Sequence, residues 1–418
     1  DPRRSKTAEE ADEWVAIRPG TDAHLLFGLV HVILASGRAD LGRAADLVDG
    51  LGELERLAPH FSPEAVAPIC GVPADDIRRL ATALLDAPTA AVYGRIGTCT
   101  QEYGTLASWL VDVVNTLTGN LDRPGGALFP KNAAGSANTG GTPGKGRGFR
   151  TGRRHSRVDG HPEVLGEFPV STLASEILTP GEGQIRALVT VAGNPVVSTP
   201  DAGRLDAALA DLEFMVSVDI YLNETTRHAD VVLPPPSQLQ RSHYDLSLLT
   251  FAIRSVANFS EPVLARDHGA PDEWEILAKV GLLAVGFPVD TDPASADDQM
   301  LRGIVERAVA DQYSPIHGRD VDEIVAALGT VAGPERHLDF MLQTGPFGAA
   351  FGANPEGASL QLLLDNPHGV DFGAMEPRLP EVLRTPSGRI ELAHPVLLAD
   401  VERLRAAVPE LEQRSLVL

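Results

Sequence analysis

The sequence predicts an α/β protein that contains two doubly wound αβα domains with mostly parallel sheets, plus a partial C-terminal linker region. Helix-like and strand-like segments alternate through residues 1–130 and again, more clearly, from about residue 185. Such alternation is typical of parallel sheets whose strands are joined by helices. We predict dinucleotide-binding domains at 1–130 and 185–290, separated by a Gly-rich basic connection at 131–184. A mixed helical and loop region at 291–380 and a linker at 381–418 follow.

The first domain is predicted from helical periodicity and one short strand. Apolar residues recur at three- and four-residue spacing from Thr21 or Asp22 to Leu34, which predicts a helix. Residues 75–85 and 105–117 are expected to form two more helices, and the apolar run 89–93 a buried strand. We interpret this order as half of a doubly wound sheet.

The second domain has the clearer pattern. Residues 187–192 and 213–218 are expected strands, with a helix at 201–212 between them and a further strand at 230–233. The spacing between the strands, about 27 residues, suits a crossover connection between parallel strands. Helices are expected near 296–311 and 320–328. Further along, a turn into a strand is expected at 385–392 and the start of a strand at 415–418.

Composition excludes several classes of protein. The 418 residues carry a formal charge of −22, which argues against general nucleic-acid binding because phosphate contacts require clustered cations. No run of 18 apolar residues is present, so we expect no membrane insertion. The low cysteine count in a chain of this size favours a reduced, cytoplasmic protein. The two cysteines, Cys70 and Cys99, are too few for a four-thiolate iron–sulfur or zinc site.

Two groups of residues are candidates for a nucleotide site. Gly193, Asn194 and Asp219 follow two neighbouring strands, where ligands bind to open parallel sheets. Glycine allows close approach of a ligand, and a carboxylate accepts hydrogen bonds from a ribose diol or a guanine edge. The same pattern also fits a tight turn and a helix-capping aspartate. In the first domain, Asp1-Pro2-Arg3-Arg4 and Gly20-Thr21-Asp22 form a comparable arrangement, with a surface arginine and a helix cap as the alternative.

Seven segments in register resemble the dimethyl sulfoxide reductase family of bis(molybdopterin guanine dinucleotide) enzymes, which includes formate dehydrogenases and nitrate reductases. The start DPRRSKTA with RPGTD is similar to the first guanine-binding region of that family, and AGNP and DIYLNET follow its pattern in the correct order. The remaining similar segments are LTGNLDRPGG at 117–126, ADVVLP at 229–234, DEW at 272–274 and TPSGRI at 385–390.

The resemblance implies where the cofactor binds. It places one guanosine end on Asp1, Arg3, Arg4, Gly20 and Asp22, and the pterin near Ile96 and Thr100. It assigns the second dinucleotide to Asn194, Val218, Asp219, Arg241 and Asp272, beside Gly193. The role of Arg241 is the least regular, since the family pattern favours a lysine or an acid-rich turn there. The implied cofactor is molybdenum bound by two molybdopterin guanine dinucleotides.

The departures from the family pattern are equally informative. Family members carry a cysteine-rich domain with a 4Fe-4S cluster and a metal-ligating residue upstream of the segment matching Asp1, and a β-barrel downstream. None of these is in this sequence, so we assign no metal ligand and no catalytic residue. We expect an incomplete chain that is inactive alone. Formate dehydrogenases have an arginine in the region matching Lys131 and Asn132, which argues against formate as the substrate.

The favoured hypothesis is a molybdopterin-dependent oxidoreductase that acts on a small-molecule substrate and passes electrons to an iron–sulfur relay. One alternative is a non-catalytic structural subunit of a respiratory complex with the same fold. Another is a nicotinamide-nucleotide dehydrogenase, although Gly94-Arg95-Ile96-Gly97 lacks the third glycine of a dinucleotide fingerprint. The basic stretch 131–157 could also bind an acidic electron-transfer protein or subunit.

Overall fold

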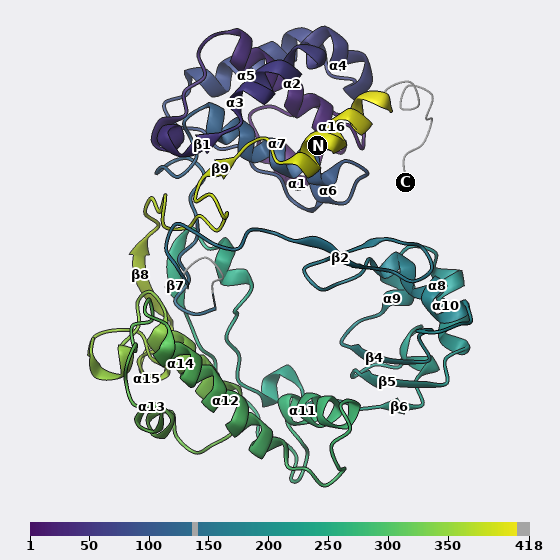
Figure 1. Cartoon of the computed structure of the whole chain (residues 1–418), viewed down its shortest axis with the longest axis vertical. Helices are drawn as coiled ribbons and strands as arrows, with labels where there is room; N and C mark the ends of the chain where they lie inside the picture. Colours follow the sequence, from purple (N-terminus) through teal and green to yellow (C-terminus); the bar gives the residue numbers. More distant parts are fainter. Residues whose placement is uncertain (136–140, 408–418) are drawn as a thin grey trace.

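The computed structural model describes residues 1–135 and 141–407, which form a mixed α/β structure with small, mostly parallel sheets. Figure 1 shows three parts: a helical unit at the top, a sheet unit on the right, and a third unit at the lower left. Within the described residues, no helix is both long and apolar enough to cross a membrane.

The N-terminal unit is built around the central helix α2 (Asp22–Ala35), in agreement with the predicted helix. This helix buries side chains around most of its circumference, and Phe27 stacks on Phe61 with ring centroids 4.1 Å apart. The predicted helices at 75–85 and 105–117 are confirmed. The helices of this unit are α1 (Lys6–Glu10), α2, α3 (Leu51–Leu57), α4 (Pro63–Cys70), α5 (Ala74–Asp86), α6 (Ile96–Cys99) and α7 (Gly104–Leu117).

The predicted strand at 89–93 is wrong, and with it the half sheet expected in this unit. The segment is extended, but its backbone is held by side chains instead of a neighbouring strand. Asn115 on α7 accepts a hydrogen bond from the Val92 N–H and donates one to the Val92 carbonyl, both at 2.8 Å. Asn120 accepts from the Ala90 N–H at 3.1 Å. Because these amides satisfy the backbone groups, the segment needs no strand partner to remain extended.

The second unit confirms the predicted crossover between parallel strands. Strands β4 (Ala187–Val191), β5 (Phe214–Val218) and β6 (Val231–Val232) pair in parallel, in the order β4-β5-β6. Helices α8 (Leu173–Leu178), α9 (Pro195–Ser198) and α10 (Ala202–Ala210) form one buried cluster with Leu188 and Met215. Val189 and Phe214, on the other face, are about half exposed. The strand order does not reverse in the described residues, so the doubly wound topology predicted here is not observed in them.

The third unit crosses the predicted boundary at residue 290. Strand β7 (Arg254–Ala257) pairs antiparallel with β8 (Val370–Ala374), so the chain before and after the boundary shares a sheet. The helices of this unit are α11 (Glu273–Ala284), α12 (Pro293–Ala310), α13 (Val321–Ala327), α14 (Pro334–Thr344) and α15 (Leu360–Leu364). The predicted helices near 296–311 and 320–328 are confirmed as α12 and α13.

The C-terminal segment differs from the predicted linker. The strand expected after residue 385 is present as β9 (Ile390–Glu391), which pairs in parallel with β1 (Val48–Asp49) of the N-terminal unit. Helix α16 (Pro395–Ala406) then packs Val401 and Leu404 into the core of that unit, beside α7 in Figure 1. Apolar residues at these positions explain the docking. The strand expected at 415–418 lies outside the described residues.

The basic connection contains a hairpin that the sequence did not predict. Strand β2 (Thr151–His155) pairs antiparallel with β3 (Pro162–Val164). The carboxylate of Glu163 forms an ion pair with Arg153 and accepts hydrogen bonds from the N–H groups of Arg153 and Gly166. One buried acid therefore fixes both strands and the turn. Residues 136–140 of this connection lie outside the described residues.

Candidate cofactor-binding site

The carboxyl ends of β4 and β5 carry a fixed polar network. Asn194, which directly precedes α9, donates a hydrogen bond to Glu224 at 2.7 Å and accepts one from the hydroxyl of Thr225 at 2.7 Å. The Thr225 hydroxyl in turn accepts from the Val196 N–H at 3.1 Å. The bond from Asn194 lowers the pKa of Glu224. The network joins the two strand ends. Thr225 and Glu224 were not predicted, because no local sequence pattern marks them and their partner Asn194 is about 30 residues away.

Asp219 lies immediately after β5, next to Val218, which is buried as the last residue of that strand. One carboxylate oxygen of Asp219 accepts a hydrogen bond from the Tyr221 N–H at 2.9 Å. The other oxygen accepts none from the described part of the chain. The following side chains are exposed, with Tyr221 at 68% and Leu222 at 81%. The free carboxylate oxygen can accept a hydrogen bond from the edge of a planar ring, and the exposed apolar side chains can contact the face of that ring.

At the strand end of β4, the backbone turns sharply before Gly193. Ala192 has a left-handed φ of 49°, and its N–H donates to the Val218 carbonyl at 2.9 Å. A Cβ placed on Gly193 would meet no atom closer than 3.7 Å. The space in front of this turn is therefore open on the protein side, which leaves room for a ligand.

The first candidate group surrounds the N-terminus of α2. Gly20 turns the chain with a φ of 78°, and Asp22 begins the helix. The carboxylate of Asp22 accepts a hydrogen bond from the Gln101 side chain at 2.8 Å, which joins two segments 79 residues apart. Ile96, which is 72% exposed, begins the short helix α6, and Thr100 is its C-cap, with a hydroxyl that donates to the Ile96 carbonyl. The resemblance placed a guanosine end at Gly20 and Asp22 and the pterin near Ile96 and Thr100, but Gln101 was not predicted.

The N-terminal loop lies on this unit as an exposed polar segment. Asp1 accepts a hydrogen bond from the Arg3 N–H at 3.0 Å, and its carbonyl accepts from the Trp14 ring at 2.8 Å. Arg3 and Arg4 are exposed and form no ion pair with any described residue. Two unpaired guanidinium groups are available to an anionic ligand.

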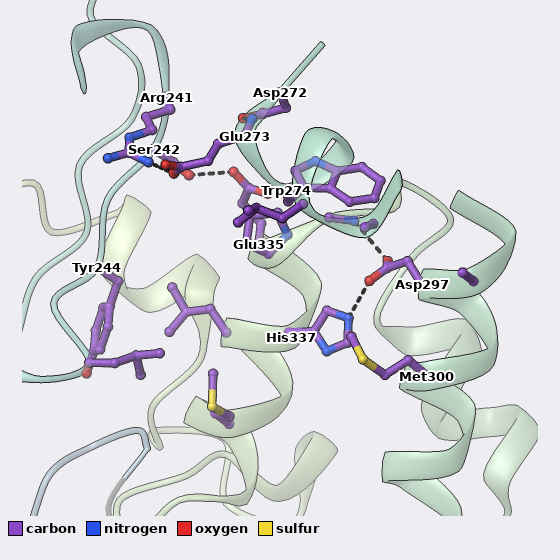
Figure 2. A pocket seen from close by; sticks show the side chains of 18 of the residues that line it. Arg241, Ser242, Tyr244, Asp272, Glu273, Trp274, Asp297, Met300, Glu335 and His337 are labelled. Atoms are coloured by element: carbon purple, nitrogen blue, oxygen red, sulfur yellow. Dashed lines mark hydrogen bonds and ion pairs between the residues drawn. The ribbon is translucent and has the colours of Figure 1, made fainter. Parts of the chain in front are cut away.

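Arg241 and Asp272 lie together elsewhere, at the rim of a cavity in the third unit (Figure 2). Arg241 forms an ion pair with Glu273. Asp272 is the N-cap of α11, where it accepts a hydrogen bond from the Glu273 N–H at 2.7 Å and pairs with Arg266 at 3.4 Å. The residues that line the cavity do not include Asn194. The structure therefore brings Arg241 and Asp272 to each other, with Asp272 already engaged as a helix cap.

The comparisons with known proteins give this geometry a family. Residues 1–263, more than half of the chain, match the family model described as molybdopterin oxidoreductase. The chain belongs to the molybdopterin oxidoreductase family. It is 28% identical to an F420-dependent formate dehydrogenase 2 subunit alpha of Methanococcus maripaludis over 322 residues, which are 74% of this chain and 46% of that protein. It is 29% identical to a nitrate reductase of Symbiobacterium thermophilum, over 68% of this chain and 40% of that protein.

The fold of this molybdopterin oxidoreductase family member agrees with a solved relative. Acetylene hydratase from Pelobacter acetylenicus superimposes with a TM-score of 0.64 at 19% identity, over 96% of this chain and 51% of that one. The chain thus spans about half the length of the proteins it matches. It is homologous to molybdopterin-dependent oxidoreductases. In the described part of the chain, no group of three or more His, Cys, Asp or Glu side chains could hold a metal ion.

The residues at both candidate positions fit a guanine dinucleotide. Guanine offers N–H donors along one edge, which the free oxygen of Asp219 can accept, and an exposed ring such as Tyr221 offers a flat surface. The unpaired Arg3 and Arg4 suit phosphate oxygens. The chain therefore offers a carboxylate at Asp219, guanidinium groups at Arg3 and Arg4 and an open turn at Gly193, whereas Arg241 and Asp272 lie at the separate cavity.

Proposed function

We propose that this chain supplies the cofactor-binding domains of a molybdenum- or tungsten-dependent oxidoreductase that holds two molybdopterin guanine dinucleotides. The observation that carries the proposal is the strand-end site in which Asp219 keeps one oxygen free, beside the Asn194, Glu224 and Thr225 network. One dinucleotide would bind there, and the second would bind at Asp22, Arg3 and Arg4. Gly193 would allow close approach of the first dinucleotide and Gly20 that of the second. Ile96 and Thr100 would face the pterin.

The bound metal would supply the exchange of an oxo group or a hydride with a small-molecule substrate, and electrons would leave through an iron–sulfur relay. The residues of this chain would bind and orient the dinucleotides. Asp219 would accept the guanine N–H groups, and the Asn194 network would keep the two strand ends at a fixed separation. Rigid placement of a cofactor is the usual contribution of the protein in such enzymes.

The test is the guanine content of the full-length protein and of two matched variants. Asp219→Ala should lower the GMP released by acid hydrolysis to about half, because one of two dinucleotides loses its main anchor. The control Asp211→Ala removes an exposed acid at the end of α10 in the same unit and should leave the GMP content unchanged. Equal GMP content in both variants would contradict the proposed site.

The two alternatives predict other results in the same measurement. A structural subunit without cofactor would contain neither metal nor guanine in the unmodified full-length protein. A nicotinamide-nucleotide dehydrogenase would bind the nicotinamide nucleotide tightly and release no GMP. Metal and GMP analysis of one preparation therefore separate the proposed function from both alternatives, and a nicotinamide-nucleotide binding measurement separates the two alternatives from each other.

A further inference from the structure

A cavity of about 770 Å³ lies among helices α11, α12 and α14 (Figure 2), and neither Asn194 nor Asp219 of the strand-end site lines it. Its walls are mainly apolar and include Trp274, Leu277, Met300, Leu338 and Met341. Cavities of about 300–1000 Å³ with apolar walls and a few directed polar groups are typical of small-molecule sites. The size and the lining therefore suit an organic ligand of moderate size.

One directed polar group is His337 on α14. Its Nε2 hydrogen-bonds to Asp297 Oδ1 at 2.7 Å, and Asp297 is itself only 7% exposed. Arg336 and the Gly333 N–H bind the other oxygen of Asp297. Burial would raise the pKa of Asp297, but these partners lower it, so the carboxylate is a stable hydrogen-bond acceptor. The imidazole orientation is thus fixed by a buried and fully bonded acid.

This arrangement leaves the second ring nitrogen of His337 for a ligand. When Nε2 carries the proton and donates to Asp297, Nδ1 of the neutral ring is an acceptor. Nδ1 forms no hydrogen bond with any residue that the structure describes, and His337 is among the residues that line the cavity. In Figure 2 the ring lies in the cavity wall with one nitrogen toward Asp297. A ligand with an O–H or N–H group can therefore donate to Nδ1.

The charges at the rim select against anions. Asp272 and Glu273 line the cavity and are paired with Arg266 and Arg241, whereas Glu335, which also lines it, has no cationic partner among the described residues. Glu335 accepts a hydrogen bond from the Ser242 hydroxyl. A pyrophosphate or a carboxylate entering here would meet an excess of negative charge in partly desolvated surroundings. Arg241 and Asp272, which the resemblance assigns to the second dinucleotide, lie at the rim, whereas the apolar interior of the cavity does not suit a dinucleotide.

We propose that this cavity binds a largely apolar organic molecule, neutral or cationic, that donates one hydrogen bond to Nδ1 of His337. The apolar walls account for most of the binding, His337 selects a hydroxyl or amine, and the acidic rim excludes anionic analogues. This site does not depend on the proposed cofactor role, so either can fail without the other.

Three probes with the same ring system test the proposal in the full-length protein. Binding of 2-naphthol, naphthalene and 2-naphthoate is measured by calorimetry at pH 7.5. We expect 2-naphthol to bind about tenfold more tightly than naphthalene, the effect of one hydrogen bond, and 2-naphthoate to bind most weakly. In His337→Phe the preference for 2-naphthol over naphthalene should disappear. Equal affinity of 2-naphthol and naphthalene in the unmodified protein would overturn the proposal, and so would a preference that survives in the variant.

A second variant locates the binding without altering His337. Gly281 on α11 lines the cavity, and a Cβ there would meet no atom within 4 Å. Gly281→Leu should fill part of the space and weaken 2-naphthol binding about tenfold. The matched control is Gly303→Leu on α12, outside the cavity lining, where a Cβ would meet only the Arg307 side chain at 3.5 Å. Binding that is unchanged by Gly281→Leu, or weakened equally by both variants, would also overturn the proposal.

Discussion

Replacement of His24 by leucine should make the N-terminal unit much less sensitive to acid. His24 lies on α2 with an exposed fraction of 0%, and neither ring nitrogen has a hydrogen-bond partner. Its ring lies edge-on to Phe61, with ring centroids 6.4 Å apart. Burial in these surroundings lowers the pKa of His24 from 6.5 to about 4, because the charged form would lose its hydration without any compensating bond.

The magnitude follows from the linkage between protonation and unfolding. The unfolded chain binds a proton near the ordinary histidine pKa, whereas the folded protein resists protonation until about pH 4. Stability is therefore complete above pH 6.5 and falls as the pH decreases toward 4. At ~1.4 kcal/mol for each unit of pKa, the total loss is ~3 kcal/mol, of which ~2.5 kcal/mol is lost by pH 4.5.

The assay is urea unfolding at pH 7.5 and pH 4.5, followed by the fluorescence of Trp109, which packs edge-to-face on Phe27 in the same core. The unmodified protein should lose ~2.5 kcal/mol more than His24→Leu between the two pH values. His24→Leu should also be more stable at pH 7.5, because it removes two buried polar atoms that have no partner. The control His31→Leu alters a partly buried histidine of α2 that bonds to the Ala58 carbonyl, and it retains His24 and the acid-dependent loss.

Parallel stability profiles for the unmodified protein and His24→Leu would refute this reasoning. Such a result would mean that the folded protein protonates His24 as readily as the unfolded chain does. The comparison uses the difference between two proteins, so other acidic groups that titrate in the same range cancel as long as they lie away from α2.

Two further changes test the packing of the other elements. Asn115→Ala should cost ~2–4 kcal/mol in urea unfolding, because it leaves the N–H and the carbonyl of Val92 without partners. Asn115→Asp should not restore the stability, since a buried carboxylate cannot donate to the Val92 carbonyl. Arg336→Met should cost ~3–5 kcal/mol, because it leaves the buried carboxylate of Asp297 without its main partner. Arg302→Ala, which removes an exposed ion pair with Asp322, should cost much less. If Arg336→Met lost no more unfolding free energy than Arg302→Ala, the ion pair between Arg336 and Asp297 would not behave as a buried pair.

Local periodicity predicted the helices well, because the apolar residues of one helix face recur every three or four positions within a short segment. The core helix from Asp22 and the helix ending at Leu117 follow directly from spacing. The strand at 89–93 could not be distinguished from an extended loop, because the difference lies in Asn115, which is 23 residues from Val92. Propensity describes a segment alone, whereas tertiary partners decide whether it joins a sheet.

The C-terminal region and the cavity depend on still longer separations. β9 reaches its partner strand at Val48 from more than 300 residues away, so no window of sequence indicates the pairing. His337 and Asp297 are 40 residues apart and were not considered as a pair. The strand-end positions Asn194 and Asp219 were predictable, because the ends of adjacent parallel strands meet at one edge of the sheet whatever the rest of the fold does.

The two carboxylates assigned to the second dinucleotide differ in how many of their oxygens already bind other groups of the protein, and this difference separates their roles. Asp272 caps α11 with one oxygen and pairs with Arg266 through the other, so Asp272→Ala should lose ~1 kcal/mol of stability whether or not cofactor is bound. Asp219 gives one oxygen to the Tyr221 N–H and keeps the other free, so Asp219→Ala should chiefly affect the cofactor-loaded protein. Thermal unfolding of each variant with and without its cofactor measures the difference. If Asp219→Ala lost the same stability with and without cofactor, Asp219 would only stabilise the turn at Tyr221 and would not bind the cofactor.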